Sequence, residues 1–283
     1  MTAFDPRITP ARPDLAAKHL EGAVAAARFV DGQTYEVVEP QAPVRRAPSP
    51  DAALLTEALM GERVIVYETT EEGWIWGQLQ ADDYVGWLPA AALAPAGPPP
   101  TDKVAALRTL VFPGPDIKLP PLAGISLGAR LAIVRPEKTF AVTAGGGFVP
   151  AQHLARLDAT EPDPVAVAER FLGVPYLWGG KTSLGIDCSG LVQVALTACG
   201  IACPRDSDMQ HRTLGSAVAV DQSFANLRRG DLVFWPSHVA IMCDATRIIH
   251  ANANRMAVTV EPLAEALVRI RATGCELASV KRL

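Results

Sequence analysis

YLWGG at residues 176–180, followed by DCSGLV at residues 187–192, is the stretch that decides how the last third of the chain folds. Apolar residues recur after it up to Gly200, which predicts a helix over residues 188–199 with Asp187 as the N-cap and Gly200 as the stop. Cys188 would begin this helix, where unpaired backbone N–H groups favour a negative charge. This placement predicts a reactive thiolate, and the alternative is an inert buried cysteine.

Length and charge limit the possible functions. The 283 residues have room for about two to three domains. A formal net charge of −4 without a basic stripe indicates no nucleic-acid partner. No apolar run approaches the roughly 18 residues of a membrane span, and residues 1–6 lack the features of a secretory signal. We therefore expect neither a membrane nor a nucleic acid as partner.

The cysteines indicate the redox environment. All five lie in the last third of the chain, and an odd number without a CxxC pair argues against a disulfide framework and a structural zinc site. Together with the missing secretory signal, this pattern predicts a reduced protein of the cytoplasm. No cofactor and no bound metal are expected.

Short β-runs separated by turns fill much of the chain before residue 160. Residues 1–40 are mixed in composition, and their role is left open. Residues 41–95 are predicted to form a small barrel, with strands at residues 63–68, 74–79 and 84–89. A Pro-rich linker leads to residues 101–158, which repeat the pattern in a second, diverged barrel. Its expected strands are residues 110–112, 129–134, 139–142 and 147–150.

Residues 160–283 show a different pattern, in which predicted helices come first and predicted strands follow. Asp163 and Pro164 predict a helix start, and the apolar pattern continues to Leu172 before Gly173. Strands are expected at residues 231–235, 238–242 and 247–250, joined by tight turns. The predicted fold class is therefore an α+β domain with an antiparallel sheet, preceded by two small all-β barrels.

A cysteine nucleophile needs a base, and the base needs an orienting partner. His238 and His250 lie on neighbouring predicted strands, so their side chains can come within roughly 5–8 Å of each other. We expect His238 to accept the Cys188 proton and His250 to hold the other ring nitrogen of His238. His211 lies in a polar helical stretch and is expected to be solvated. A zinc site made by the two histidines and Cys188 is the weaker alternative, because no H-x-E or P-C-x-x-C pattern accompanies them.

These residues carry two resemblances to known families. The glycine, tryptophan and acidic residues of segments 59–62, 73–74 and 83–89 resemble the bacterial SH3-like domain of cell-wall peptidases. Six motifs in order resemble the NlpC-type papain-like cysteine peptidases over residues 160–283. They are YLWGG at 176–180, DCSGLV at 187–192, PRDSDMQ at 204–210, GDLVF at 230–234, SHVAI at 237–241 and IHA at 249–251.

The second resemblance implies a γ-D-glutamyl-L-diamino-acid endopeptidase. By motif, Cys188 would be the nucleophile, His238 the general base and His250 the orienting residue. Tyr176 would lie at the rim of the oxyanion site.

Barrels placed before the peptidase resemble the dipeptidyl-peptidase type, which trims murein peptides during recycling and needs a free N-terminal L-Ala. The resemblance implies that Asp187 and Tyr84 receive the substrate ammonium, with a glutamate that is either Glu57 or Glu62. Ser189 and Ser207 would line the D-Glu pocket. The third substrate residue, diaminopimelate or Lys, and the oligomeric state are left open.

Two other functions compete with this interpretation. The papain-like domain could be inactive, with the barrels binding a wall fragment, although an intact set of Cys188, His238 and His250 speaks against it. Alternatively, the same fold could act as an amidase or acyltransferase on another substrate such as lipid. The absence of an amphipathic anchor in the sequence disfavours lipid.

Overall fold

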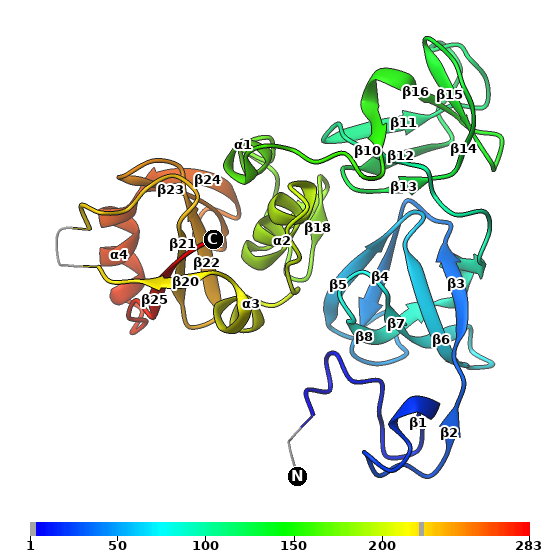
Figure 1. The fold of residues 1–283 in the computed structure, drawn as a ribbon, viewed down its shortest axis with the longest axis horizontal. Helices are drawn as coiled ribbons and strands as arrows, with labels where there is room; N and C mark the ends of the chain where they lie inside the picture. Colours follow the sequence, from blue (N-terminus) through cyan, green and yellow to red (C-terminus); the bar gives the residue numbers. More distant parts are fainter. Residues whose placement is uncertain (1–3, 221–223) are drawn as a thin grey trace. The chain divides into compact units, whose positions relative to one another are not determined.

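The computed structural model of the protein describes residues 4–220 and 224–283, so the first three residues of the predicted segment 1–40 lie outside the described part. The chain divides into two compact units, Met1–Ala159 and Thr160–Leu283. Figure 1 shows that the first unit is built almost entirely of strands, whereas the second combines helices with a sheet. This agrees with the predicted α+β class for the second unit and the all-β class for the first.

The first barrel is an antiparallel sheet of seven strands in the order β5-β4-β8-β7-β6-β3-β9. Its strands are β3 (Gln33–Val37), β4 (Gln41–Arg45), β5 (Leu54–Leu59), β6 (Arg63–Thr69), β7 (Trp74–Leu79), β8 (Val85–Pro89) and β9 (Leu93–Pro95), with a 3₁₀ turn, η2 (Ala90–Ala92), before β9. The three predicted strands correspond to β6, β7 and β8. β3 lies before the predicted boundary at residue 41, because it pairs with both β6 and β9 and so completes the sheet.

The second barrel consists of three small antiparallel sheets around a core of its own. Its strands are β10 (Asp102–Val104), β11 (Arg108–Val111), β12 (Ala123–Ser126), β13 (Arg130–Leu131), β14 (Ile133–Pro136), β15 (Phe140–Thr143), β16 (Phe148–Pro150) and β17 (Leu154–Arg156), with η3 (Ala151–His153) before β17. The predicted strand 129–134 is divided into β13 and β14, because its two halves pair with different partners, β10 and β15.

The two barrels touch at a glycine turn. Gly61 has a φ of +78°, and a Cβ there would lie 2.0 Å from the Arg130 carbonyl oxygen. The backbone N–H of Arg130 donates to the Met60 carbonyl at 2.8 Å. Only glycine combines this conformation with so close an approach of two backbones.

The N-terminal segment, whose role the sequence left open, packs on the first barrel. It contains the short parallel strands β1 (Ala16–Ala17) and β2 (Phe29–Val30) and the 3₁₀ turn η1 (Lys18–Leu20). Leu15 and Ala17 join a buried apolar cluster with Tyr67 and Trp76 of the barrel. The Arg12 guanidinium lies 4.4 Å from the ring centre of Trp76, a cation–π contact that helps to hold the segment in place.

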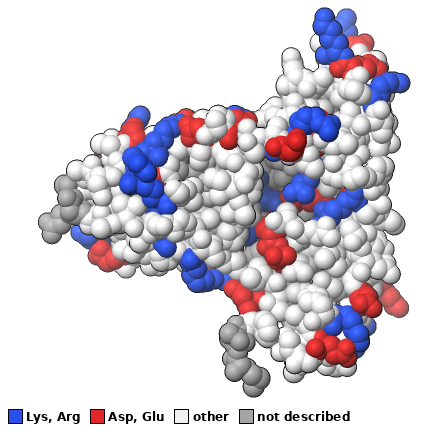
Figure 2. All heavy atoms as spheres, viewed as in Figure 1, with Lys and Arg blue, Asp and Glu red and all other residues white. Residues whose placement is uncertain are grey.

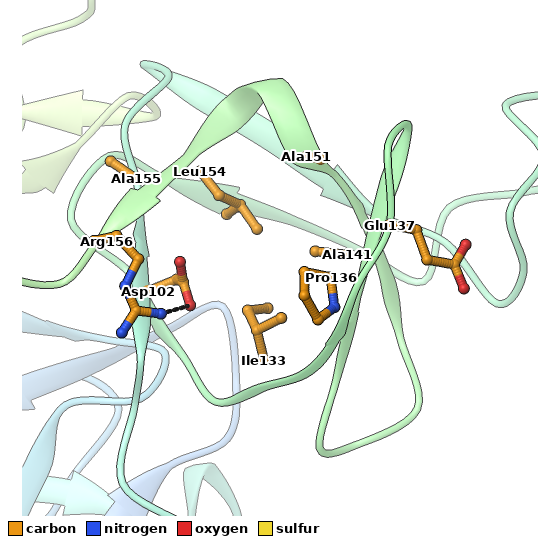
Figure 3. Close-up of a pocket in the computed structure, with 9 residues that line it drawn as sticks. All are labelled: Asp102, Ile133, Pro136, Glu137, Ala141, Ala151, Leu154, Ala155 and Arg156. Atoms are coloured by element: carbon orange, nitrogen blue, oxygen red, sulfur yellow. Dashed lines mark hydrogen bonds and ion pairs between the residues drawn. The ribbon is translucent and has the colours of Figure 1, made fainter.

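The second barrel also holds a pocket of about 420 Å³. Figure 3 shows apolar side chains, among them Ile133, Pro136 and Leu154, beside the ion pair of Asp102 and Arg156. None of the side chains predicted to act in catalysis or substrate binding lines this pocket. On the molecular face of Figure 2, basic and acidic side chains are interspersed.

The second unit is built on an antiparallel sheet of six strands in the order β20-β25-β21-β22-β23-β24. Its strands are β20 (Ser216–Val218), β21 (Leu232–Trp235), β22 (His238–Met242), β23 (Arg247–Asn252), β24 (Ala257–Pro262) and β25 (Ser279–Arg282), and a separate hairpin pairs β18 (Lys181–Thr182) with β19 (Gly185–Ile186). The helices are α1 (Pro164–Glu169), α2 (Cys188–Ala198), α3 (Ser207–Thr213) and α4 (Leu263–Arg271). In Figure 1, α4 lies on one side of the sheet and α1 and α2 lie on the other.

Alternation along the strands explains this arrangement. Val233 and Trp235 of β21 share a buried cluster with Leu263 and Ala266 of α4, so every second residue of the strand faces that helix. The residues between them are also buried, because α2 packs against β22 and β23 from the other side. The sheet is therefore covered on both faces. Within the described residues, no helix is both long and apolar enough to span a bilayer.

Helix α1 is shorter than predicted. Asp163 caps it through Val165 N–H at 2.9 Å and Pro164 opens it, as expected, but it ends at Glu169 rather than near Leu172. The reason is tertiary pairing, since the Gly173 N–H donates to the Val258 carbonyl and the Val258 N–H donates to the Val174 carbonyl. The chain leaves the helix early to pair with β24.

Candidate active site

The N-terminus of α2 is organised by Asp187. Its Oδ1 accepts a hydrogen bond from the Gly190 N–H at 2.7 Å, which is the N-cap contact that the sequence predicts. The helix ends at Ala198, and Gly200 follows with a φ of +77°. Cys188 is therefore the first residue of a helix with both of its predicted boundaries.

Asp187 also holds the YLWGG turn against this helix. Its Oδ2 accepts from the Gly179 N–H at 2.8 Å. A Cβ on Gly190 would lie 2.4 Å from the Gly180 carbonyl oxygen, so a glycine is required where the turn crosses the first turn of α2. Tyr176 is the first residue of this turn. Its backbone N–H donates a hydrogen bond to the Met256 carbonyl at 2.9 Å.

Arg205 completes the cluster, and the sequence reasoning gave it no role. Its side chain is 1% exposed and makes a bidentate pair with Asp187, at 2.9 Å from Nη1 to Oδ1 and 2.7 Å from Nη2 to Oδ2. It also donates to Ser189 Oγ at 2.9 Å and to the Gly180 carbonyl at 3.2 Å. A buried guanidinium needs such partners. The available signal was an arginine directly before the acidic Asp206, at the start of a polar segment.

The electrostatics of Cys188 differ from the prediction of a stabilised thiolate. Cys188 is 6% exposed, and burial followed by the charge of Asp187 raises the pKa of its thiol to about 12. Backbone N–H groups of Val239 and Ser189 and the charge of Arg205 act in the opposite direction, toward a lower pKa. Burial is the main reason that a thiolate is disfavoured, and the N-cap carboxylate adds to it because it takes up helix N–H donors and places a negative charge beside the sulfur. Burial thus favours the neutral thiol of Cys188.

His238 is positioned by a tight hairpin. Trp235 and His238 are paired across β21 and β22, so Pro236 and Ser237 alone form the turn. Ser237 has a φ of +60°, an uncommon conformation for a residue with a side chain. The ring of His238 lies 5.6 Å from that of Trp235 between centres. Because Val239 N–H reaches the Cys188 sulfur, the start of β22 adjoins the N-terminus of α2.

The structure brings His238 and His250 into direct contact. His238 Nε2 lies 2.8 Å from His250 Nδ1, so the two histidines share one face of neighbouring strands as predicted. Burial, followed by the charges of His250 and Arg269, lowers the pKa of His238 to about 3. The imidazole of His238 is therefore neutral near pH 7 and can accept a proton.

Behind His250 lies Glu261, which the sequence reasoning missed. His250 Nε2 is 2.8 Å from Glu261 Oε1, and Arg269 forms an ion pair with the same oxygen. The hydrogen bond from His250, together with the charges of His250 and Arg269, lowers the pKa of Glu261. Both nitrogens of the His250 ring are thus in use, which favours the nucleophile–base interpretation over a zinc site.

The residues expected to bind substrate fall into two groups. Tyr176, Ser189 and Ser207 lie in the second unit with the histidines. Burial, followed by the charges of Cys188 and Asp187, raises the pKa of Tyr176, so its phenol keeps its proton. Ser189 Oγ donates to Asp187 Oδ1 at 3.2 Å, and Ser207 is the first residue of α3.

The remaining candidates belong to the first barrel. The ring of Tyr84 is a member of its core cluster. Glu57 and Glu62 are both buried, and Glu62 Oε2 accepts from the Leu59 N–H at 2.9 Å, which closes the turn between β5 and β6. The substrate contacts expected of Tyr84, and of either Glu57 or Glu62, stay predictions.

The structure contradicts the prediction that His211 is solvated. Its Nε2 lies 2.7 Å from Ser279 Oγ, and its ring centre lies 5.1 Å from that of Phe234. The polar residues around His211 do not indicate that one face of α3 packs on the sheet.

Comparison with known proteins follows the same division of the chain. Residues 173–275 match the NlpC/P60 family, and residues 44–93 match the bacterial dipeptidyl-peptidase SH3 domain. The chain is 28% identical over 242 residues to the γ-D-glutamyl-L-lysine dipeptidyl-peptidase of Bacillus cereus, covering 74% of this chain and 71% of the relative. It is 37% identical over 139 residues to the γ-DL-glutamyl hydrolase of Bacillus subtilis, covering 46% of this chain and 32% of that protein.

A solved structure shows the same fold. The crystal structure of an NlpC/P60 family protein from Bacillus cereus matches with a TM-score of 0.72 at 22% identity, over 88% of this chain and 99% of the other. The chain therefore contains an NlpC/P60 domain at residues 173–275, with a dipeptidyl-peptidase type of SH3 domain before it. It is a cysteine peptidase.

Proposed function

We propose that Cys188 is the nucleophile, His238 the general base and His250 the residue that orients it. The observation that carries this proposal is the 2.8 Å contact of the two histidines at the strand whose backbone N–H reaches the Cys188 sulfur. A buried thiol at a helix start and a neutral imidazole with one nitrogen held by a partner are the components of acyl transfer to cysteine.

The proposed reaction has two stages. The Cys188 sulfur attacks the scissile carbonyl while its proton moves to His238, and the protonated His238 then gives that proton to the leaving amine. Water, deprotonated by His238, hydrolyses the thioester and releases the acid. Because the Tyr176 phenol keeps its proton, it can donate a hydrogen bond to the oxyanion that forms.

The proposed substrate is a murein peptide cleaved after γ-D-Glu. Support comes from the names of the relatives, which describe γ-D-glutamyl-L-lysine and γ-glutamyl bonds, and from the motif matches at Ser189 and Ser207. We further propose that a free N-terminal L-Ala is required, with Tyr84 as an ammonium ligand. The proposed barrel glutamate is either Glu57 or Glu62, which are both buried.

We also propose that the negative charge of Asp187 attracts the ammonium of the substrate. Its two oxygens already accept from Gly179, Gly190, Ser189 and Arg205, so its main contribution is to hold the turn and the helix. All five cysteines are free thiols, which supports a proposed role in the cytoplasm, on peptides released during wall recycling.

Incubation with L-Ala-γ-D-Glu-meso-diaminopimelate, its L-Lys counterpart and the N-acetylated form of each tests the proposal. Mass analysis should show L-Ala-γ-D-Glu and the free diamino acid from the unblocked peptides only. Cys188→Ala should remove cleavage and keep the fold, whereas Cys199→Ala, at the end of the same helix, should retain it. Full activity of Cys188→Ala would refute the nucleophile, and equal cleavage of acetylated peptide would refute the L-Ala requirement.

A further inference from the structure

Four side chains form a continuous polar chain away from Cys188. They come from four consecutive elements, His238 on β22, His250 on β23, Glu261 on β24 and Arg269 on α4. The linking contacts are 2.8 Å from His238 to His250 and 2.8 Å from His250 to Glu261, followed by the ion pair of Glu261 with Arg269. The His250 side chain is fully buried, and those of Glu261 and Arg269 are 14% and 30% exposed.

Donors and acceptors along this chain can be assigned from its outer end. Arg269 can only donate, and Glu261 is an ionised carboxylate that can only accept. His250 Nε2 must therefore carry the proton that it shares with Glu261. In a neutral His250 ring, Nδ1 is then the acceptor, so His238 Nε2 carries a proton and donates to it. The unprotonated nitrogen of His238 is Nδ1.

We propose that Glu261 and Arg269 are positioning residues of the peptidase, which fix the tautomers of both histidines and set His238 Nδ1 as the base. This inference rests on the proposed roles of Cys188 and His238. Arg269 matters because a lone carboxylate would attract a second proton onto the histidine pair, and its cation balances that charge.

Arg269 and Glu261 carry opposite charges and therefore act on the pKa of His238 in opposite directions. Arg269 lowers the pKa of His238 and Glu261 raises it, in addition to the effects of burial and of His250. On the α2 side, Cys188 adjoins β22, and the further charged or titratable groups near its sulfur are Asp187, Arg205 and Tyr176. Removing Arg269 alone should therefore favour protonated His238, and removing Glu261 alone should disfavour it.

Steady-state kinetics against pH on the full chain, with L-Ala-γ-D-Glu-meso-diaminopimelate, tests the inference. Arg269→Gln should move the acid limb of kcat/KM to higher pH. Glu261→Gln should lower kcat by about 10- to 100-fold with KM little changed and without that shift, because an orienting group one residue from the base is lost. The double variant should return the limb toward the wild-type position and keep the loss in kcat.

Arg271→Gln is the matched control. It lies on the same helix, is 69% exposed and pairs with Glu276 on the surface, so it should behave as wild type. Nitrogen NMR of the Cys188→Ala protein gives a readout without turnover. His238 should show a protonated Nε2 and an unprotonated Nδ1, and Glu261→Gln should disturb this state.

The possible results distinguish a failure of this inference from a failure of the proposed function. A wild type that does not cleave the peptide contradicts the proposed function. A wild type that cleaves, with Arg269→Gln and Glu261→Gln indistinguishable from Arg271→Gln, overturns the positioning role. Shifts of the limb in the same direction for both variants overturn it as well. If Glu261→Gln does not fold, the Arg269→Gln shift and the NMR of His238 still decide.

Discussion

Burial favours the neutral forms of both Cys188 and His238, which bears on when a proton would move in the proposed reaction. Burial and the Asp187 charge raise the pKa of the thiol to about 12, and burial, with His250 and the Arg269 cation nearby, lowers that of the imidazole to about 3. The thiol pKa thus lies far above the imidazole pKa, so proton transfer from Cys188 to His238 is uphill in the resting site. It should accompany attack on the substrate.

We therefore expect kcat/KM to keep its value down to a pH well below the ordinary histidine pKa of 6.5, because His238 becomes protonated only in more acidic solution. The acylation rate should also be slower in D2O than in H2O. Alkylation of Cys188 by iodoacetamide should rise with pH throughout the range in which the protein stays folded. A plateau of alkylation between about pH 5 and 8 would instead reveal a preformed thiolate–imidazolium pair.

Sequence reasoning located this cysteine correctly and misjudged its charge. The cap, the apolar repeat and Gly200 are local signals, and they define the helix on their own. Burial of Cys188 and the turn of the Asp187 carboxylate toward Gly179 depend on tertiary contacts. The sequence around a helix N-terminus therefore predicts the position of a cysteine better than the pKa of its thiol.

At the scale of elements, the bidentate pair of Arg205 and Asp187 joins three segments that are far apart in sequence. It ties the segment before α3 to the start of α2 and to the YLWGG turn. An ion pair this deeply buried contributes little net stability when intact, but removal of one partner leaves an uncompensated charge.

Arg205→Met should accordingly lower the free energy of unfolding of the second unit by about 3–5 kcal/mol. Arg229→Met is the comparison, because Arg229 also forms carboxylate ion pairs, with Asp163 and Glu169, but is 41% exposed. Arg229→Met should lower the free energy of unfolding by less than about 1 kcal/mol. Urea unfolding followed by tryptophan fluorescence measures both, and equal losses would show that burial is not the deciding factor.

The elements themselves were largely predictable from the sequence. Strands β22 and β23 follow from their apolar runs and the short connection between them, and the contact of His238 with His250 follows from that hairpin. Glu261 and Arg269 had no comparable signal. Their approach to His250 needs the pairing of β24 with β23 and the return of α4 over the sheet, and neither is a local property of the sequence.

At the scale of the whole molecule, each unit has its own buried core. The first barrel packs around Val37, Val44 and Leu88, and the second unit packs around Val233, Ala240 and Ile248. A mutation in one core should therefore leave the packing of the other intact. The proposed ammonium ligand Tyr84 belongs to the core of the first barrel.

Tyr84→Phe tests the proposed role of Tyr84 while preserving the aromatic ring in the barrel core. If the hydroxyl binds the substrate ammonium, its loss should raise KM for the free-amine peptide by about 10- to 150-fold, because a charge-assisted hydrogen bond is worth about 1.5–3 kcal/mol. The turnover number should change little, since Cys188 and His238 are untouched. Tyr67→Phe is the control, because the Tyr67 hydroxyl already bonds to Gln78 at 3.3 Å within the barrel. If both variants bind the free-amine and the acetylated peptide like wild type, the amine is recognised by residues of the second unit alone.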